Sequence, residues 1–200
     1  NVTEDSAKLG LPRDAAGLLL IQLDGAEEAV AKEMGRILDM AQANGSVSIK
    51  AAETAAESDE LWTARRAAYG IFARMAPNVV VEDATVPVSR IPEMVMGTRE
   101  IADRQGLKMG ILAHAGDGNL HPVIAADMRD ADEWRRVEAA VKEIFQLAVD
   151  LDGTLSGEHG IGSAKKDFLP LVMNSATREL TSAIKKTLDP KGILNPGKFV

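Results

Sequence analysis

The chain has 200 residues, of which 46% are hydrophobic and 26% charged, a composition that excludes a largely disordered protein and allows one sizeable core. It carries no run of about 18 uncharged apolar residues and no signal-peptide pattern, so a transmembrane helix is excluded and a cytoplasmic location is expected. The net charge of −7 and the 4% aromatic content argue against nucleic-acid binding, and the absence of cysteine excludes disulfides, thiolate metal sites and cysteine nucleophiles.

Apolar spacing in the first part of the chain predicts alternating strands and helices. Residues 18–23 form a short apolar run, which is typical of a buried strand. Asp24 and Glu27 have the spacing of a capping box, and apolar residues then repeat at helical intervals until Asn44. In chain order we expect a strand over 18–23, a helix that begins after Asp24 and ends at Asn44, a short strand over 46–50 and a helix over 58–72.

The remainder of the chain continues this alternation and adds one clear hairpin. Asp130 and Glu133 form a second capping-box pattern, before an amphipathic run that ends near Leu151. We expect strands over 78–86, 107–114, 119–125 and 154–156, and helices over 91–105, 130–151 and 175–188. The pattern predicts one α+β domain over residues 1–200, with a mostly antiparallel sheet and helices packed on one face.

Two of the three histidines in the chain border the hairpin loop in residues 114–121, HAGDGNLH. Asp-Gly at 117–118 favours a two-residue turn, which would place His114 opposite His121 with Cβ atoms about 4.5–5.5 Å apart. Asn119 would project from the same face, because side chains alternate along a strand. Two imidazoles this close suit a divalent metal. The alternative is a hairpin with incidental, hydrogen-bonded histidines.

The third histidine lies in a glycine-rich turn at residues 157–162, GEHGIG. Glu158 could complete a three-ligand metal site with open positions, while His159 could face a substrate and act as a base at neutral pH. A phosphate-binding loop is disfavoured because no Gly-Lys-Ser/Thr sequence is present. A purely structural turn is the other alternative.

Arg65 shares a predicted helix face with Leu61 and Tyr69, whereas Arg66 is rotated about 100° away and is expected to be solvated. A guanidinium on a semi-apolar face could bind a carboxylate bidentately. An ordinary ion pair with one of the acidic residues is the alternative.

Together these stretches resemble the C-terminal, substrate-side domain of FAD-linked oxidases of the vanillyl-alcohol-oxidase type, a family that includes the glycolate oxidase flavoprotein subunit and D-lactate dehydrogenase. The resemblance implies a ferredoxin-like cap domain. It covers roughly residues 16–200 and rests on the stretches at 61–65 (LWTAR), 82–93 (EDATVPVSRIPE), 114–121, 157–162 and 189–198 (DPKGILNPGK).

The resemblance also implies a role for seven residues. These are His114, His121 and Glu158 as ligands of a divalent metal, Zn or Mn; His159 as the base; Arg65 and Asn119 as substrate-binding residues, with Arg65 on the carboxylate; and Asn195 in a segment near the flavin. The branch that acts on 2-hydroxyglutarate has a lysine where this chain has Val81. A monocarboxylate such as D-lactate or glycolate is therefore the expected substrate.

The implied function is oxidation of a 2-hydroxy acid to the 2-oxo acid by FAD. The flavin would be bound mainly by an N-terminal domain that this chain lacks, so we interpret the chain as a C-terminal fragment. An electron-acceptor protein or an iron–sulfur subunit is the implied protein partner. Two other functions remain open, namely a metabolite-sensing module without catalysis and a flavin-independent metallohydrolase.

Overall fold

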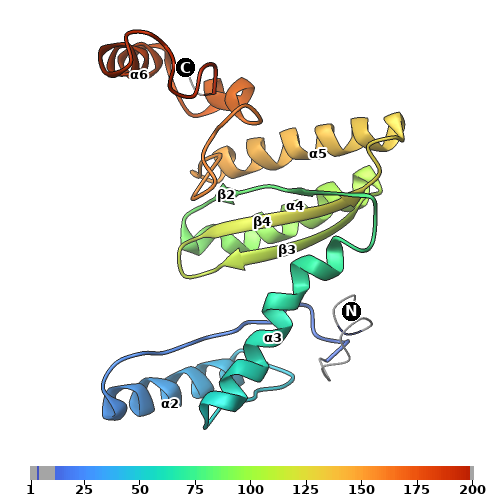
Figure 1. Ribbon diagram of the computed structural model, residues 1–200. Helices are drawn as coiled ribbons and strands as arrows, with labels where there is room; N and C mark the ends of the chain where they lie inside the picture. The colour runs from blue at the N-terminus through green and yellow to red at the C-terminus, as the bar shows by residue number, and fades with distance from the viewer. Residues whose placement is uncertain (1–3, 5–11, 199–200) are drawn as a thin grey trace. The chain divides into compact units, whose positions relative to one another are not determined.

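The computed structural model describes residue 4 and residues 12–198, which fall into two compact units, Asn1–Arg74 and Met75–Val200. The first unit contains the helices α2 (Glu27–Ala43) and α3 (Ala55–Phe72) (Figure 1). Helix α2 ends at Asn44 as expected, but Ala26, not Asp24, precedes it and provides no side-chain cap. Helix α3 begins three residues earlier than predicted, because Thr54 and Glu57 form a reciprocal capping box.

The two strands predicted for the first unit, over 18–23 and 46–50, are wrong. Both segments lack strand structure, and most of their apolar side chains are exposed, with Leu19 at 70% and Val47 at 66%. A strand needs a neighbour that accepts and donates backbone hydrogen bonds, and no strand pairs with either segment among the described residues. The apolar pattern alone therefore did not decide the backbone structure.

The second unit holds the sheet. Its elements are β1 (Asn78–Val81), β2 (Ala84–Thr85), the 3-10 helix η1 (Val88–Arg90), α4 (Ile91–Gln105), β3 (Lys108–His114), β4 (Asn119–Ala126), α5 (Ala131–Asp150), the 3-10 helix η2 (Lys166–Leu171) and α6 (Ser175–Leu188). Strand β4 pairs antiparallel with β3, β1 and β2. The strand predicted over 78–86 is interrupted at Glu82 and Asp83, and the one predicted over 154–156 is reduced to a single bridge between Thr154 and Thr85.

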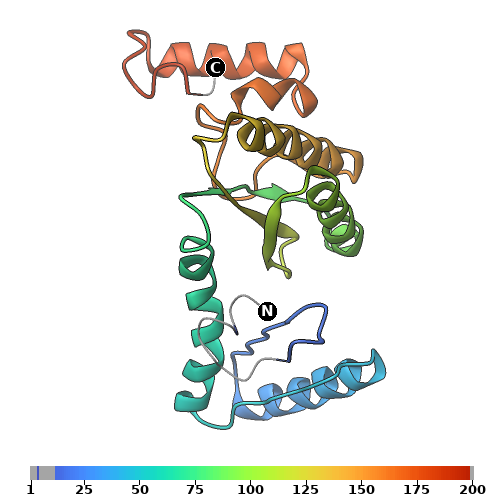
Figure 2. The ribbon, with the colours of Figure 1, turned by 90° about the vertical axis from the view of Figure 1, so that its right-hand side faces the viewer.

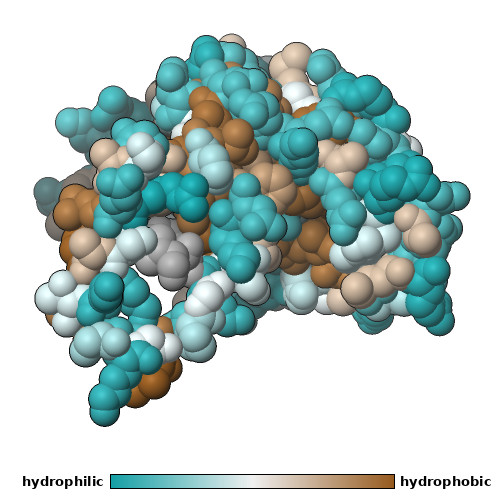
Figure 3. All heavy atoms as spheres, turned by 90° about the horizontal axis from the view of Figure 1, so that it is seen from above, coloured by the Kyte–Doolittle hydropathy of each residue, from teal (hydrophilic) through white to brown (hydrophobic). Residues whose placement is uncertain are grey.

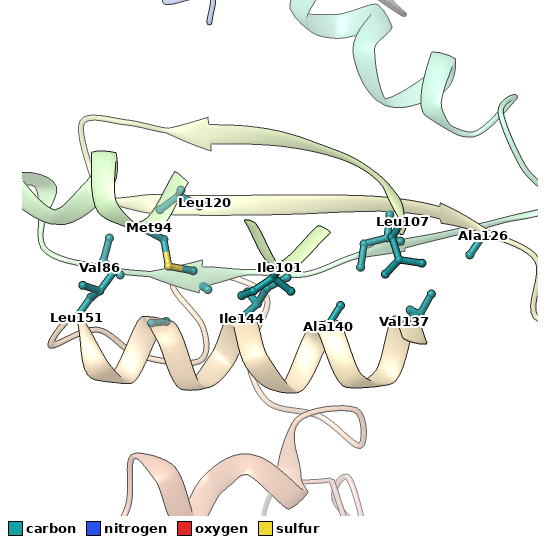
Figure 4. Packing of buried hydrophobic residues seen from close by; sticks show 13 residues of the cluster. Val86, Met94, Ile101, Leu107, Leu120, Ala126, Val137, Ala140, Ile144 and Leu151 are labelled. Atoms are coloured by element: carbon teal, nitrogen blue, oxygen red, sulfur yellow. The ribbon is translucent and has the colours of Figure 1, made fainter. Parts of the chain in front are cut away.

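Helices α4 and α5 pack on one face of this sheet (Figure 2), which confirms the predicted α+β class. Leu120 and Ile124 of β4 point into the core, and Figure 4 shows Val137, Ala140 and Ile144 of α5 pointing toward the same layer. Asp130 caps α5 as predicted, by accepting a hydrogen bond from the Glu133 amide at 3.0 Å. Because side chains alternate along a strand, residues 119 and 121 of β4 project from the face opposite this core.

Helix α6 follows η2 and contributes no buried residue. Its apolar residues Leu180, Ile184 and Leu188 are spaced four apart and share one exposed face. Figure 3 shows apolar surface in brown among hydrophilic residues in the view from above. No helix among the described residues is long and apolar enough to cross a membrane.

Candidate metal and substrate site

The hairpin between β3 and β4 carries two of the site histidines, in a register that differs from the prediction. His114 pairs with Asn119 and Leu112 pairs with His121, so the loop has four residues, 115–118, and the predicted pairing of the two histidines is wrong. His121 lies two residues beyond Asn119 and hence on the same face of the sheet as His114, in a diagonal position. The two rings still meet edge to face, with centroids 5.3 Å apart.

A neighbouring segment explains the longer loop. The Asp117 amide donates to the His114 carbonyl at 3.0 Å, which closes a turn one residue pair earlier than a two-residue loop would. The Gly118 carbonyl in turn accepts a hydrogen bond from the Val86 amide at 2.9 Å. Gly118 has a φ of 73°, and a Cβ atom at this position would overlap the Val86 carbonyl oxygen. Contact with the segment after β2 therefore fixes the loop.

Glu158 joins the two histidines to form a cluster of three side chains that could hold a metal ion. Its Oε1 atom lies 2.9 Å from Nε2 of His121 and 3.6 Å from Nε2 of His114. One ligand atom from each residue falls within 4.8 Å of the others. Two imidazole nitrogens and one carboxylate oxygen form a donor set that suits Zn²⁺ or Mn²⁺ and leaves coordination positions open.

The surroundings of His121 fit the role of a neutral ligand. Its Nδ1 atom lies 3.3 Å from the backbone carbonyl of Glu82, so an Nδ1–H tautomer donates there and leaves the Nε2 lone pair facing Glu158. Burial lowers the pKa of His121, and the nearby His159 acts in the same direction, although the bond to Glu82 opposes them. The uncharged form that a metal requires is thereby favoured.

His159 lies beside this cluster, and of the three histidines its ring nitrogen is the farthest from Glu158 Oε1. Its ring stacks on His121, with centroids 5.0 Å apart and an interplanar angle of 18°. Its Nε2 atom is 3.7 Å from Glu158 Oε1, and its side chain is 44% exposed. The arrangement leaves His159 accessible to a small molecule that reaches the cluster.

Asn119 occupies the floor of the site and is only 5% exposed. Its Oδ1 atom accepts a hydrogen bond from the Thr85 hydroxyl at 3.2 Å, which orients the amide. A Cβ atom on Gly157 would come within 2.9 Å of the Asn119 Nδ2 atom, so the glycine-rich turn packs directly on this amide. Asn119 is therefore brought together with the Glu158 and His159 turn.

A buried charged pair, which was not predicted from the sequence, lies beneath the turn. Asp83 is 0% exposed, and its carboxylate accepts hydrogen bonds from the amides of Gly157, Glu158 and His159 at 2.8–3.2 Å. Burial acts to raise the pKa of Asp83, but these bonds and one from the Ser156 hydroxyl outweigh it and hold the pKa well below the ordinary range. Lys165, 5% exposed, lies 3.7 Å from the carboxylate.

One sequence signal could have revealed Asp83. The acidic pair Glu82 and Asp83 interrupts an apolar run that was predicted as one continuous strand. A charge inside a buried strand needs a partner, and it breaks the strand in this structure.

The other two predicted site residues belong to segments that do not carry this cluster. Arg65 is half-buried on α3 of the first unit, while its neighbour Arg66 is exposed and forms an ion pair with Asp59 at 2.8 Å. Asn195 lies in the tail after α6 with a φ of 45°. It lines a groove of about 710 Å³ between the tail, α6 and residues 161–162. The roles of Arg65 and Asn195 stay predictions.

Comparison with known proteins decides the family. The chain matches the family described as FAD linked oxidases, C-terminal domain, over residues 1–199. The chain belongs to this family. Its fold is also similar to that of 4-ethylphenol oxidase from Gulosibacter chungangensis, with a TM-score of 0.56 and 17% identity over 87% of this chain and 37% of that one.

Several curated relatives share this domain. The chain is 43% identical to the glycolate oxidase subunit GlcD of Bacillus subtilis, covering 99% of this chain and 42% of that protein. It is 34% identical to the Escherichia coli K12 subunit of the same name, with 98% and 40% covered. A mitochondrial cytochrome-type D-lactate dehydrogenase of Arabidopsis thaliana is 34% identical, with 86% and 31% covered. The chain thus spans about two fifths or less of these relatives.

Proposed function

We propose that this chain is the C-terminal, substrate-side part of an FAD-dependent enzyme that oxidises a 2-hydroxy acid of the D-lactate or glycolate class to the 2-oxo acid. The observation that carries the proposal is the cluster of His114, His121 and Glu158 beside His159. Relatives named glycolate oxidase subunit and D-lactate dehydrogenase support the substrate class. The part of those relatives beyond this chain would hold most of the flavin site.

His114, His121 and Glu158 would hold a divalent ion, Zn²⁺ or Mn²⁺. The chemistry that such an ion supplies is Lewis acidity, which lowers the pKa of a hydroxyl group. The chemistry that the flavin supplies is acceptance of a hydride. Asn195, in the tail, would lie near the flavin.

The side chains of this chain would orient the substrate and move one proton. His159, through its neutral ring nitrogen, would accept the proton of the substrate's α-hydroxyl group. The amide of Asn119, held by Thr85, would donate a hydrogen bond to the substrate. Arg65 would bind the carboxylate in a bidentate manner. Val81 offers no charge for a second carboxylate, which favours a monocarboxylate substrate.

The experiment that tests this proposal compares two variants of the full-length protein. His159→Asn keeps a similar size but cannot accept the proton, so kcat/KM for the 2-hydroxy acid should fall about 10²- to 10⁴-fold with metal content near wild type. His121→Ala should lose the metal, because it removes a buried ligand.

Other outcomes would assign the site differently. Metal lost from His159→Asn in proportion to activity would make His159 a ligand. Equal metal content in wild type and His121→Ala would remove the metal from the site. Substrate binding without turnover by the flavin-loaded protein would favour a sensing module, and hydrolysis without flavin would favour a metallohydrolase. The electron-acceptor partner and the cytoplasmic location stay predictions.

A further inference from the structure

The carboxylate of Asp83 is the most extensively bonded side chain below the site. It is completely buried and accepts hydrogen bonds from the three consecutive amides of residues 157–159 and from the Ser156 hydroxyl. The Ser156 oxygen in turn accepts the Gly160 amide at 2.7 Å. Five donors in one short turn are thereby directed at a single carboxylate and its serine partner.

These bonds determine where the neighbouring side chains point. When the amides of Glu158 and His159 are fixed, the directions of their Cα–Cβ bonds are restricted as well. The Glu158 carboxylate then lies 2.9 Å from Nε2 of His121, and the His159 ring stacks on the His121 ring. The carboxylate of Asp83 bonds to the Ser156 hydroxyl and to backbone amides of the turn, so its effect on Glu158 and His159 passes through this turn.

Lys165 stabilises the buried carboxylate from the other side. Its ammonium group donates to the backbone carbonyls of Asp83 and Leu155, both at 2.8 Å, and lies 3.7 Å from the Asp83 carboxylate. The lysine therefore ties the strand break at residues 82–83 to the segment that leads into the turn. A buried ion pair of this kind costs desolvation energy, and removing one partner leaves an uncompensated buried charge.

Glu82, the residue before Asp83, contacts the hairpin part of the site. The Glu82 carbonyl accepts from Nδ1 of His121, and the Glu82 amide donates to the Pro122 carbonyl at 3.0 Å. Two adjacent residues at one strand break thus contact both the hairpin histidine and the turn that carries Glu158.

We propose that Asp83 is a positioning residue that holds Glu158 and His159 in register with the hairpin histidines. This inference rests on the proposed metal site. It adds the requirement that the buried Asp83 carboxylate hold the turn at residues 157–159, so that Glu158 can complete the ligand set.

The test uses the full-length protein with Zn²⁺ and Co²⁺ as probes and Asp83→Asn as the variant. The amide side chain keeps the shape but replaces an acceptor oxygen by a donor that faces backbone N–H groups. Zn²⁺ affinity should fall about 10- to 100-fold, and the visible absorption of bound Co²⁺ should change. Hydrogen exchange should rise at the amides of residues 157–159 and not in β4.

Asp127→Asn is the matched control, because Asp127 is a partly exposed carboxylate that pairs with Arg129 away from the site. It should leave metal affinity and exchange at residues 157–159 at wild-type values. Ser156→Ala is the second variant, since it removes one donor to Asp83 without leaving Lys165 beside a neutral group. It should weaken Zn²⁺ binding in the same direction, by a smaller factor, even if Asp83→Asn does not fold.

The outcomes separate this inference from the proposed function. Unchanged Zn²⁺ affinity in Asp83→Asn, or in Ser156→Ala where only that variant folds, would overturn the role of Asp83, provided that His121→Ala loses the metal. If the wild-type protein binds neither probe, the metal site fails. Hydrogen exchange at residues 157–159 of the Asp83→Asn variant then decides. A rise confined to that turn supports Asp83 as its positioning residue, and exchange at the wild-type rate rules this out.

Discussion

At the scale of single residues, hydrogen bonds between backbone and side-chain atoms prepare the site. The Glu82 carbonyl selects the tautomer of His121, and the amides of the turn bind Asp83. Two of the residues that would touch a substrate, Asn119 and His159, therefore begin from restricted positions. Such preorganisation is what a catalytic site requires, because small displacements of reacting groups are costly.

Arg65 provides the first prediction at this scale. In the full-length enzyme, Arg65→Lys should raise KM for the 2-hydroxy acid about tenfold, because a point charge replaces a bidentate fork and about 1.5 kcal/mol of charged hydrogen bonding is lost. Arg66→Lys is the control, since Arg66 is exposed and paired with Asp59. Steady-state kinetics measures both. Equal effects of the two substitutions would mean that the other face of α3 serves the substrate.

Gly157 provides the second prediction at this scale. A Cβ atom there would overlap the Thr85 hydroxyl and press on the Asn119 amide. Gly157→Ala should therefore lower the free energy of unfolding by about 1–3 kcal/mol, as overpacking does, and should also raise KM by displacing Asn119. Gly116→Ala in the hairpin loop is the control, because nothing lies within 4 Å of its Cβ position. Denaturant titration that found the two variants equally stable would contradict the close approach.

At the scale of elements, the sequence was informative about helices and about which residues meet, but not about pairing. Helices α4 and α6 begin and end at the predicted residues, because capping and apolar repeats are local signals. The register of β3 on β4 was missed because the loop depends on Val86, a residue distant in sequence. The apolar segments 18–23 and 46–50 were misassigned for the same reason, since a strand is defined by its partner.

The end of α6 provides a prediction about pH. Asp189 pairs with Lys185 and accepts the amides of Leu194 and Ile193 at 2.9 and 3.1 Å. The Lys185 ammonium and these amides lower the pKa of Asp189 to about 2. A carboxyl group whose pKa is lowered on folding stabilises the folded tail at pH values above its unfolded-state pKa of about 3.9. This contribution is lost as the pH falls toward the folded-state pKa of about 2.

Amide protection at Ile193 and Leu194 should therefore decrease between about pH 4 and pH 2, once corrected for intrinsic exchange. In Asp189→Asn the protection should be low and nearly independent of pH across this range. Asp167→Asn, which changes an exposed carboxylate on η2, should retain the wild-type decrease. A decrease of the same size in Asp189→Asn would show that another group controls the tail.

At the scale of the whole molecule, the residues proposed for metal binding and for substrate binding belong to different units of the chain. All three proposed metal ligands lie in the unit Met75–Val200, whereas Arg65 lies in Asn1–Arg74. The chain covers 42% or less of the three relatives compared above. Metal binding is therefore a property that one unit could carry, while oxidation of a substrate would require groups from both units and from a flavin-binding domain.

This division predicts that metal and flavin binding can be separated. The isolated 200-residue chain should bind Zn²⁺, more weakly than the full-length protein, and should retain no FAD after gel filtration. His114, His121 and Glu158 are all present in it, whereas most of the flavin contacts are proposed to lie in a separate domain. Absorbance of the flavin and metal analysis of the same sample give both stoichiometries.

His121→Ala in the isolated chain is the control for specific metal uptake, because it removes a ligand that is 6% exposed. Stoichiometric FAD in the isolated chain would contradict the assignment of the flavin site to a separate domain. Zn²⁺ retained equally by His121→Ala would instead show that the uptake does not depend on the hairpin histidines.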